Sequence, residues 1–254
     1  MIDTHCHLYS DELANDIEAV IDRAIEAGVD RFYLPAIDSS TTTAMLALEQ
    51  KFPDKCFAMA GLHPCSVKEN FEEELRHVEA LLAERPFAGV GEAGLDFYWD
   101  VSFKEQQYKA LERQIQLALE YELPLILHTR NAMAETIAVV SKFAGSGLRG
   151  IFHCFGGTLK EAQEIIEMDF LLGIGGVVTY KKSTLPLVLS DIDLKHLVLE
   201  TDAPYLAPVP YRGKRNESSY LPEVAKHIAL IKNTTIEVVD RITSENALAL
   251  FRKK

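Results

Sequence analysis

The amino-acid sequence predicts a single α/β domain folded as a (β/α)₈ barrel, and three observations support this prediction. The 254 residues match the roughly 250 residues that one such barrel typically needs. Apolar runs alternate with amphipathic stretches along the chain, which favours a parallel sheet with helices between its strands. Side chains that commonly bind metal ions follow several of the apolar runs, and a barrel gathers its strand ends on one face. A doubly wound open sheet is the alternative fold.

Eight short runs of apolar, β-branched or aromatic residues are the predicted strands. They cover residues 2–4, 31–36, 56–60, 87–90, 125–127, 150–152, 170–174 and 196–199. Eight strands within this length favour a closed barrel over an open sheet. The chain contains no composition shift, linker or low-complexity segment, so residues 1–254 are expected to form one domain.

Amphipathic stretches separate nearly all of these strands and are the predicted helices. In the first of them, Leu13, Ile17 and Val20 recur at helical spacing, and Gly28 ends the pattern. The predicted helices cover residues 12–27, 41–50, 71–84, 102–121, 132–143, 158–168, 221–231 and 236–251. The segment 205–220 interrupts the alternation, and we expect a long loop there on the face that carries the strand ends.

The composition argues against several classes of protein. Hydrophobic residues make up 48% of the chain, which supports a large core and argues against disorder. No apolar run approaches the roughly 18–20 residues that span a bilayer, and the first residues lack the basic and apolar regions of a signal peptide. We therefore expect a cytoplasmic protein without a membrane partner. Nothing in the sequence indicates an obligate protein partner.

The net charge and the cysteines narrow the expectations further. A net charge of −12 disfavours a protein that coats nucleic acid, because such a surface repels phosphate. It does not exclude a nucleic-acid enzyme, since two divalent cations would add about +4 locally. The four cysteines show no CxxC spacing and are expected to be free thiols. Cys6 and Cys154 neighbour histidines, but a strand points them to the opposite face, so we interpret them as buried apolar residues.

Two histidines follow the first predicted strand. His5 and His7 lie two residues apart, so a strand places both imidazoles on one face. Two converging neutral imidazoles suit a first-row divalent metal. A pair of ordinary surface or core histidines is the alternative, and ligand-type residues at later strand ends favour the metal.

Three further candidate ligands follow the fourth, fifth and sixth predicted strands. Glu92 has Gly91 and Gly94 beside it, which allow the backbone to turn sharply and bring the carboxylate close to other groups. A carboxylate of this kind can bridge two cations. His128 and His153 each end a short apolar run. Taken singly, these are more often a loop glutamate and hydrogen-bonded core histidines, but their recurrence on successive strands favours a shared metal site.

Asp202 follows the last predicted strand. Its carboxylate is suited both to ligate an ion and to accept a proton from water. Glu200 lies two residues earlier and on the same face of the strand. We therefore expect Glu200 to orient one of the ligands rather than to bind an ion.

Candidate substrate contacts lie at the third strand end and in the long loop. His63 precedes Pro64 and is expected to face substrate, with a histidine held in a proline turn as the alternative. Arg212, Lys214 and Arg215 place three cations within four residues, which suits a phosphate oxyanion. A solvated basic loop is the alternative.

Together these motifs resemble the TatD family of metal-dependent deoxyribonucleases, which belongs to the amidohydrolase-like TIM barrels. The matching segments follow one order along almost the whole chain, at residues 3–8, 61–64, 91–96, 128–130, 153–157, 200–206 and 211–217. The resemblance implies a two-metal hydrolase. His5, His7 and Asp202 would hold one ion. His128 and His153 would hold the second, and Glu92 would bridge the two.

Two positions depart from the family's usual pattern. Asn131 stands where the family often has an acidic residue, and Ser218 stands where it often has proline. Neither is a proposed ligand, so the departures concern substrate preference more than catalysis.

The leading hypothesis is hydrolysis of DNA phosphodiester bonds by a 3′-to-5′ exodeoxyribonuclease, with nucleic acid as the partner. The expected cofactors are two divalent cations, Mg²⁺, Mn²⁺ or Zn²⁺. Asp202 would act as the general base beside the bridging Glu92. His63 and the three cations at residues 212–215 would hold the phosphate or stabilise the leaving oxygen.

Two alternatives keep the fold and change the activity. The same site could serve a metal-dependent hydrolase of a carboxylic ester, a lactone or an amide, including an aminoacyl ester on tRNA, because fold does not determine substrate. A non-catalytic, metal-stabilised scaffold is the other alternative, and it leaves the candidate base Asp202 without a role.

Overall fold

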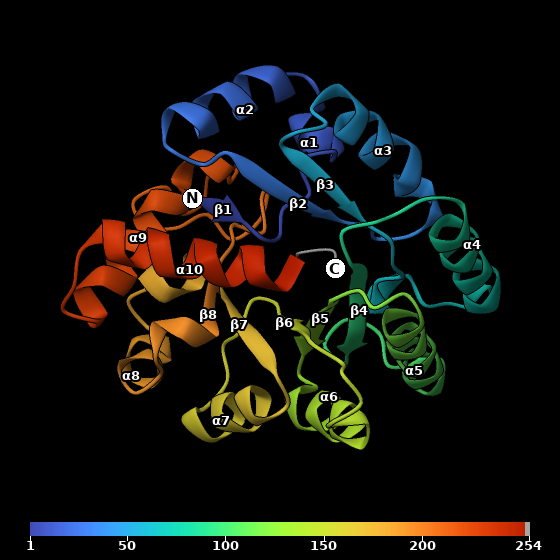
Figure 1. The fold of residues 1–254 in the computed structure, drawn as a ribbon. Coiled ribbons are helices and arrows are strands. Elements are labelled where there is room, and N and C mark those ends of the chain that lie inside the picture. The colour runs from blue at the N-terminus through green and yellow to red at the C-terminus, as the bar shows by residue number, and fades with distance from the viewer. Residues whose placement is uncertain (252–254) are drawn as a thin grey trace.

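Eight parallel strands surround a central axis in the computed structural model, which describes residues 1–251 (Figure 1). They are Ile2–Asp3 (β1), Arg31–Pro35 (β2), Cys56–Met59 (β3), Val90–Asp96 (β4), Leu125–Arg130 (β5), Gly150–Phe152 (β6), Phe170–Ile174 (β7) and Leu197–Leu199 (β8). One ladder joins β1 to β3 and a second joins β4 to β8. The predicted (β/α)₈ barrel is confirmed. The predicted domain, 1–254, extends three residues beyond the described range.

Local backbone contacts join the two ladders on both sides. Ala60 and Val90 form a parallel bridge between the end of β3 and the start of β4. On the other side, the backbone N–H of Thr4 donates to the carbonyl oxygen of Leu199 at 3.0 Å. The strands therefore enclose an interior, as a barrel requires.

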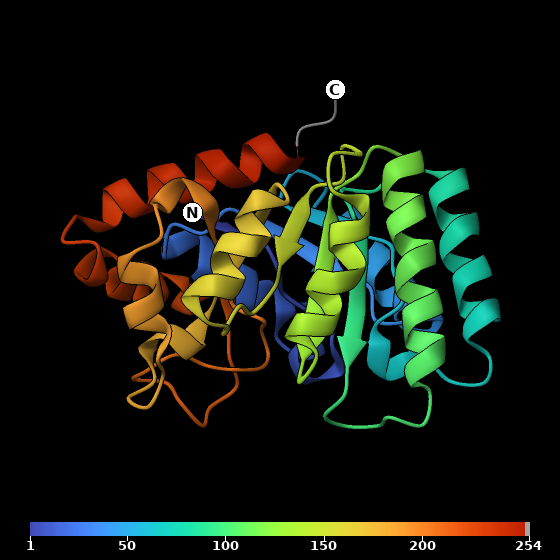
Figure 2. The ribbon, with the colours of Figure 1, turned by 90° about the horizontal axis from the view of Figure 1, so that it is seen from below.

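Helices surround the strands, and α10 lies across the end of the barrel at which the strands begin (Figures 1 and 2). They are Asp11–Ala14 (α1), Ile17–Glu26 (α2), Thr42–Lys51 (α3), Phe71–Glu84 (α4), Lys104–Glu120 (α5), Met133–Val140 (α6), Leu159–Glu167 (α7), Leu185–Ser190 (α8), Leu221–Ile231 (α9) and Ile236–Phe251 (α10). The long loops that follow β4 and β8 project at the opposite end (Figure 2). Among residues 1–251, no helix has the length and apolar character to cross a membrane.

A small apolar cluster fills the barrel interior beneath α10. Its buried members are Ile2, Tyr33, Met59, Ile126, Ile151 and Val198 from six strands, with Ala247 and Leu250 from α10. Side chains alternate along a strand, so residues two positions further along point into the same interior. These next positions include His128 after Ile126 and His153 after Ile151. The strands whose apolar residues fill the interior thus also direct His128 and His153 toward the same point.

Strand β4 differs from its prediction. The sequence predicted a strand over 87–90 that ends before Glu92, whereas β4 runs from Val90 to Asp96 and contains Glu92. The pairing with β5 shifts between Val90 and Ala93. Gly94 has a φ of 146°, and a Cβ there would lie 1.9 Å from the carbonyl oxygen of His128. Glycine is unfavourable inside most strands, so the segment resembles a turn in sequence while its role is close contact with β5.

Two helical regions also differ from their predictions. The helix predicted over 12–27 is divided into α1 and α2, and Asp16 lies between them with its carboxylate bound to Arg215 of the loop after β8. Aspartate is a weak helix former, and this tertiary contact holds it outside the helix. The short helix α8 was not predicted. By contrast, α9, α10 and β7 have the predicted bounds.

Candidate metal centre

The six predicted ligands converge at the end of the barrel where the strands finish. His5 and His7 follow β1, Glu92 lies in β4, His128 lies in β5, and the remaining two follow β6 and β8. Five of them line a pocket of about 650 Å³, and His5 is buried behind it, next to Glu92. Five groups of potential ligands were predicted from five strand ends, and the fold brings their side chains together.

Glu92 is the centre of this cluster, and its two oxygens face different histidines. Oε2 lies 3.1 Å from Nε2 of His5 and 3.5 Å from Nε2 of His7. Oε1 lies 2.9 Å from Nδ1 of His128 and 3.7 Å from Nε2 of His153. The side chain is 3% exposed. One buried carboxylate is therefore shared by these four imidazoles, and Nε2 of His63 also lies 3.4 Å from Oε1.

Asp202 lies nearer the solvent at the mouth of the same cluster. Its Oδ1 lies 3.6 Å from Nε2 of His7, 3.8 Å from that of His5 and 3.9 Å from that of His153. Its side chain is 15% exposed, against 3% for Glu92. Asp202 thus lies near three of the histidines that Glu92 contacts, but it remains accessible from the pocket.

Hydrogen bonds fix the orientation of His7 and His128. Tyr9 donates its hydroxyl proton to the carbonyl oxygen of Pro35, so its oxygen is left to accept from Nδ1 of His7 at 3.0 Å. Asp96 accepts from Nε2 of His128 at 2.9 Å. Each ring is then left with the lone pair of its other nitrogen facing Glu92. Second partners of this kind are usual for histidines that bind metals.

Glu200 orients the third histidine, as predicted from strand periodicity. Its Oε1 lies 3.0 Å from Nδ1 of His153 and accepts the backbone N–H of Cys154 at 2.6 Å. Glu200 is fully buried. The arrangement directs Nε2 of His153 toward Glu92 and Asp202.

His63 has the opposite orientation of donors. Its Nδ1 accepts the backbone N–H of Cys65 at 3.0 Å, so the neutral ring carries its proton on Nε2. That nitrogen lies 3.4 Å from Oε1 of Glu92 and 3.3 Å from His128. Burial lowers the pKa of His63, which favours the neutral ring. His63 therefore presents an N–H donor to the pocket.

The carboxylates of the cluster stay ionised. Burial opposes the charge on Glu92, but His5, His63 and His153 outweigh it and hold its pKa well below the usual range. At Asp202, burial is likewise outweighed by His7 and His153, and the pKa is lowered. Burial opposes the charge on His153 as well, yet the nearby Glu200 raises its pKa to about 9. The buried carboxylates therefore need positive charge beside them, which protonated histidines such as His153 or bound cations can supply.

The donor atoms fit divalent cations. Nitrogen and oxygen ligands at about 2.0–2.2 Å from one ion lie roughly 3–3.5 Å from each other. The closest contacts of Glu92 with His5 and His7 fall in this range, at 3.1 and 3.5 Å. Imidazole and carboxylate donors together suit Zn²⁺, Mn²⁺ or related ions. A cation would also separate the lone pairs of the imidazoles from the carboxylate oxygens that face them.

The three predicted basic contacts lie in different surroundings. Arg215 forms ion pairs with both oxygens of Asp16, at 2.7 Å each, and with Glu217 at 3.0 Å. Arg212 lies over the ring of Tyr180, with its Cζ 4.5 Å from the ring centre. Lys214 lies near the ring of Tyr211. None of the three lines the metal pocket within the described residues, and their contact with phosphate stays a prediction.

The four cysteines and Ser218 are not among the predicted ligands. All four cysteines are free thiols, as predicted. Cys6 is buried, whereas Cys154 is only half-buried and lines the pocket beside His153. Ser218, one of the departures from the family pattern, donates to Oδ2 of the buried Asp3 at 2.7 Å. It therefore supports the backbone just before His5 rather than the pocket.

Sequence reasoning missed several residues of the site as individuals. Asp96 lies four residues after Glu92 on the same strand, so strand periodicity could have placed it beside the cluster. Tyr9 is two residues beyond His7, which is the same signal. Trp99 and Arg130 also line the pocket. Arg130 ends β5 two residues after His128, so strand periodicity could have placed it as well, whereas no pattern in its own segment distinguishes Trp99.

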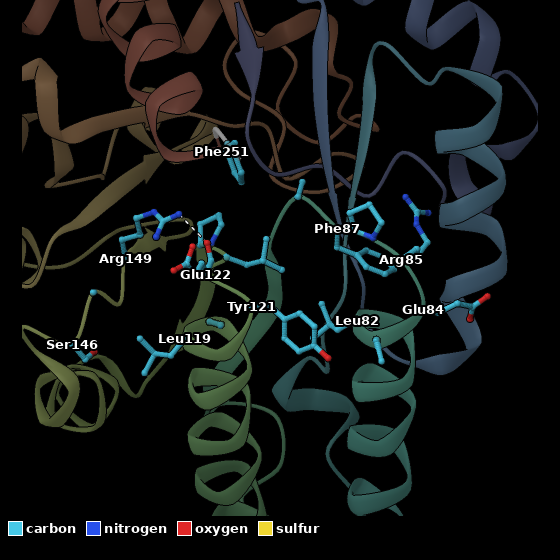
Figure 3. Close-up of a pocket in the computed structure, with 17 residues that line it drawn as sticks. Leu82, Glu84, Arg85, Phe87, Leu119, Tyr121, Glu122, Ser146, Arg149 and Phe251 are labelled. Atoms are coloured by element: carbon cyan, nitrogen blue, oxygen red, sulfur yellow. Dashed lines mark hydrogen bonds between the residues drawn. The ribbon is translucent and has the colours of Figure 1, made fainter. Parts of the chain in front are cut away.

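A second hollow of about 640 Å³ opens at the other end of the barrel, beside α4, α5 and the last residue of α10 (Figure 3). Its two arginines already have partners: Arg85 pairs with Glu49, and Arg149 donates to the carbonyl oxygen of Glu122 at 3.0 Å. None of the six predicted ligands lines it. The cluster of candidate ligand side chains is what distinguishes the first pocket from this hollow.

Comparisons with known proteins agree with this site. A family model described as "TatD related DNase" matches residues 2–252. The chain is 38% identical to the "uncharacterized metal-dependent hydrolase YabD" of Bacillus subtilis, over 99% of each chain. It is 33% identical to the "3'-5' ssDNA/RNA exonuclease TatD" of Edwardsiella piscicida, again over 99% of each.

A solved structure shows the same architecture. The TatD homologue YJJV of Escherichia coli K12 superimposes with a TM-score of 0.94 at 29% identity, covering 100% of this chain and 98% of that one. The match covers the barrel and the loops at its strand ends. The chain therefore belongs to the TatD family of metal-dependent hydrolases.

Proposed function

We propose that this hydrolase cleaves phosphodiester bonds of single-stranded nucleic acid, DNA above all, from the 3′ end, with two divalent cations. The observation that carries the proposal is the shared carboxylate of Glu92, whose two oxygens face separate pairs of histidines. The printed name of the Edwardsiella relative, a 3′-to-5′ exonuclease of single-stranded DNA and RNA, supports the substrate and the direction.

The arrangement of donors supports two ion positions. His5, His7 and Asp202 would hold one ion from the side of Oε2 of Glu92. His128 and His153 would hold the other from the side of Oε1. When bound, divalent cations polarise a phosphoryl group and make water acidic enough to act as a nucleophile near neutral pH.

The chain's own residues then have separate roles. Asp202 is ionised and accessible from the pocket, so it is placed to accept a proton from the attacking water. His63 presents a neutral Nε2–H donor, which suits hydrogen bonding to a phosphate oxygen or to the leaving oxygen. Contacts with Asp96, Tyr9 and Glu200 hold the rings of His128, His7 and His153 in their orientations.

Lysine and arginine side chains outside the pocket would attract the phosphates of the nucleic-acid substrate. Arg212 shares a shallow hollow with Lys181 and Lys182, so three positive charges gather beside the loop that follows β8. Lys214 lies in the same loop and pairs with no carboxylate within residues 1–251. We assign Arg212 and Lys214 to phosphates away from the scissile bond. Arg215 is already held by Asp16 and Glu217.

The test is digestion of single-stranded DNA oligonucleotides, labelled at the 5′ end or the 3′ end, with Mg²⁺ or Mn²⁺. We expect a ladder of shortened 5′-labelled products and early release of the 3′ label. Glu92→Gln should abolish digestion. Glu84→Gln is the matched control, because Glu84 lines the hollow at the far end of the barrel. Absence of digestion by the natural protein, or digestion by Glu92→Gln at the natural rate, would refute the proposal.

A further arm separates phosphodiester from ester chemistry. Charge reversal at Arg212 and Lys214 should raise the KM for oligonucleotides and leave hydrolysis of a neutral carboxylic ester unchanged. Efficient hydrolysis of a neutral ester or lactone, without digestion of nucleic acid, would identify the other class of substrate and contradict the proposal.

A further inference from the structure

Two large aromatic side chains are exposed beside the metal pocket. Tyr98 is 52% exposed and Trp99 is 68% exposed. Both belong to the loop between β4 and α5, which projects at the strand-end face (Figure 2). Trp99 lines the same pocket as His63, Glu92 and Asp202. An exposed indole at this position has no part in the apolar core, so its place calls for another explanation.

Arg130 completes a wall with these two rings. Its Cζ lies 3.9 Å from the centre of the Tyr98 ring and 5.1 Å from the centre of the Trp99 ring. The two rings meet edge to face, with centres 4.8 Å apart and planes at 85°. Arg130 forms no ion pair with a carboxylate within residues 1–251. The wall therefore offers an open aromatic surface and an unpaired positive charge side by side.

The wall is fixed to the metal cluster by Asp96. Oδ1 of Asp96 accepts the backbone N–H groups of Tyr98 at 2.9 Å and Trp99 at 3.2 Å. Oδ2 of the same carboxylate holds His128. The backbone N–H of Phe97 donates to the carbonyl oxygen of Arg130 at 2.9 Å. Exposed as it is, the aromatic pair is anchored by the carboxylate that also orients a candidate metal ligand.

A groove continues from the metal pocket past this wall. A second depression of about 820 Å³ is lined by the first residues of α6 and α7 and shares Thr129, Arg130 and Cys154 with the metal pocket. A chain lying across the metal cluster has room to continue into this groove. Arg130 stands where the two spaces meet.

We propose that Trp99 stacks on an unpaired base of the nucleotide beside the scissile phosphodiester, while Arg130 contacts the adjoining phosphate. The proposal rests on the proposed nuclease function and names the subsite that positions its substrate. Aromatic side chains bind bases of any sequence, because every base has a π-face. An apolar acyl group would need no cation at the wall, whereas a nucleotide uses both the ring and the charge.

The first test uses the intrinsic fluorescence of the protein. Trp99 is the one tryptophan in the 254-residue sequence, so it reports on its own subsite. The natural protein with Mg²⁺ is titrated with a phosphorothioate oligonucleotide, whose linkages resist hydrolysis. We expect saturable quenching by the oligonucleotide and little quenching by the same strand with base-free residues at its 3′ end. Equal quenching by both strands, or none by either, would overturn the proposal.

The second test measures binding and turnover in variants. Trp99→Ala should raise the Kd and KM for single-stranded DNA roughly 10-fold to 100-fold, while Trp99→Phe should retain most of the affinity. Tyr121→Ala removes an exposed ring at the far end of the barrel and should change neither constant. On the strand with base-free 3′ residues, Trp99→Ala should cause no further loss.

The outcomes separate this inference from the proposed function. If the natural protein digests DNA but Trp99→Ala has an unchanged KM, the stacking subsite is refuted and the nuclease stands. If the natural protein neither binds nor digests any oligonucleotide, the nuclease itself is refuted. A KM that rises equally for normal and base-free strands would show that Trp99 has a structural role, and it too would overturn the inference.

Discussion

The two ends of this barrel carry hollows of nearly equal size, about 650 Å³ at the metal cluster and about 640 Å³ beside α10. The metal pocket holds buried histidines and carboxylates whose lone pairs face one another. The other hollow is lined by side chains such as Leu82, Tyr121 and Phe251, and its arginines are bound to other groups (Figure 3). The volume of a hollow therefore does not identify a functional site. The convergence of several side chains that can bind a metal ion does.

The difference follows from the direction of the strands. Parallel strands bring all their carboxyl ends to one face, and the interior alternation carries Ile126 toward His128 and Ile151 toward His153. At the other face the same strands present apolar residues, which α10 covers. The strand-end face can carry polar groups because the apolar interior of the barrel is packed beneath α10 at the opposite end.

The largest effect is expected at the shared carboxylate. Glu92→Gln removes a charge that faces both pairs of histidines, so kcat for DNA should fall by more than about 100-fold. Bound metal, measured by mass spectrometry after dialysis, should fall with it. Full metal content together with full activity would show that Glu92 is not a ligand.

A smaller effect is expected at Asp96, which contacts the candidate ligand His128. Asp96→Asn weakens the anchor of His128 and of the loop that carries Trp99, so activity or metal affinity should fall about 10-fold to 100-fold. Asp54→Asn, at an exposed position, is the matched control and should have no effect. Steady-state kinetics across a range of Mn²⁺ concentrations measures both, and equal rates for the two variants would contradict the anchoring role.

The ion pairs beneath the long loop should affect stability and not catalysis. The hydrogen bond from Arg215 lowers the pKa of Asp16 to about 2, below the value of about 3.9 for an unfolded chain. A lowered pKa stabilises the fold above pH 4, and this contribution disappears as the pH falls from 4 to 2. Asp16 is more than one-third exposed, so solvent screening limits the effect to about 1 kcal/mol or less.

Asp16→Asn should therefore lower the free energy of unfolding slightly at pH 7 and progressively less below pH 4. Urea denaturation at several pH values measures this. The KM for DNA should not change. A raised KM at unchanged stability would instead place Arg215 in the path of the substrate.

The smallest effect is expected at the far hollow. Tyr121 lines it and has no contact with the metal cluster, so Tyr121→Ala should leave kcat/KM within about twofold of the natural protein, as surface changes usually do. A large loss would mean that the two ends of the barrel are coupled.

Much of this site could be predicted because barrel geometry turns scattered residues into neighbours. His5, His128 and Asp202 are far apart in sequence, yet each follows an apolar run, and parallel strands bring such positions together. Glu200 was placed beside the ligands by alternation alone. The regular helices α9 and α10 were predicted with their bounds because their periodicity is strong.

The rest depended on contacts between distant segments. Glu92 lies within β4 because glycines fit the strand closely against β5, and glycine in a sequence more often signals a turn. The break at Asp16 depends on Arg215, almost 200 residues away. The position of Trp99 beside the pocket depends on its contacts with Asp96 and Arg130. Such contacts leave no periodic signal in the sequence.

We propose that Glu92 joins two ion positions at the strand-end face. Crystals grown with Mn²⁺, examined by anomalous scattering at the manganese edge, test it most directly. We expect two peaks, one among His5, His7 and Asp202 and one beside His128 and His153, with Glu92 bound to both. Manganese that makes no contact with Glu92, or that binds at the α10 end instead, would contradict the account.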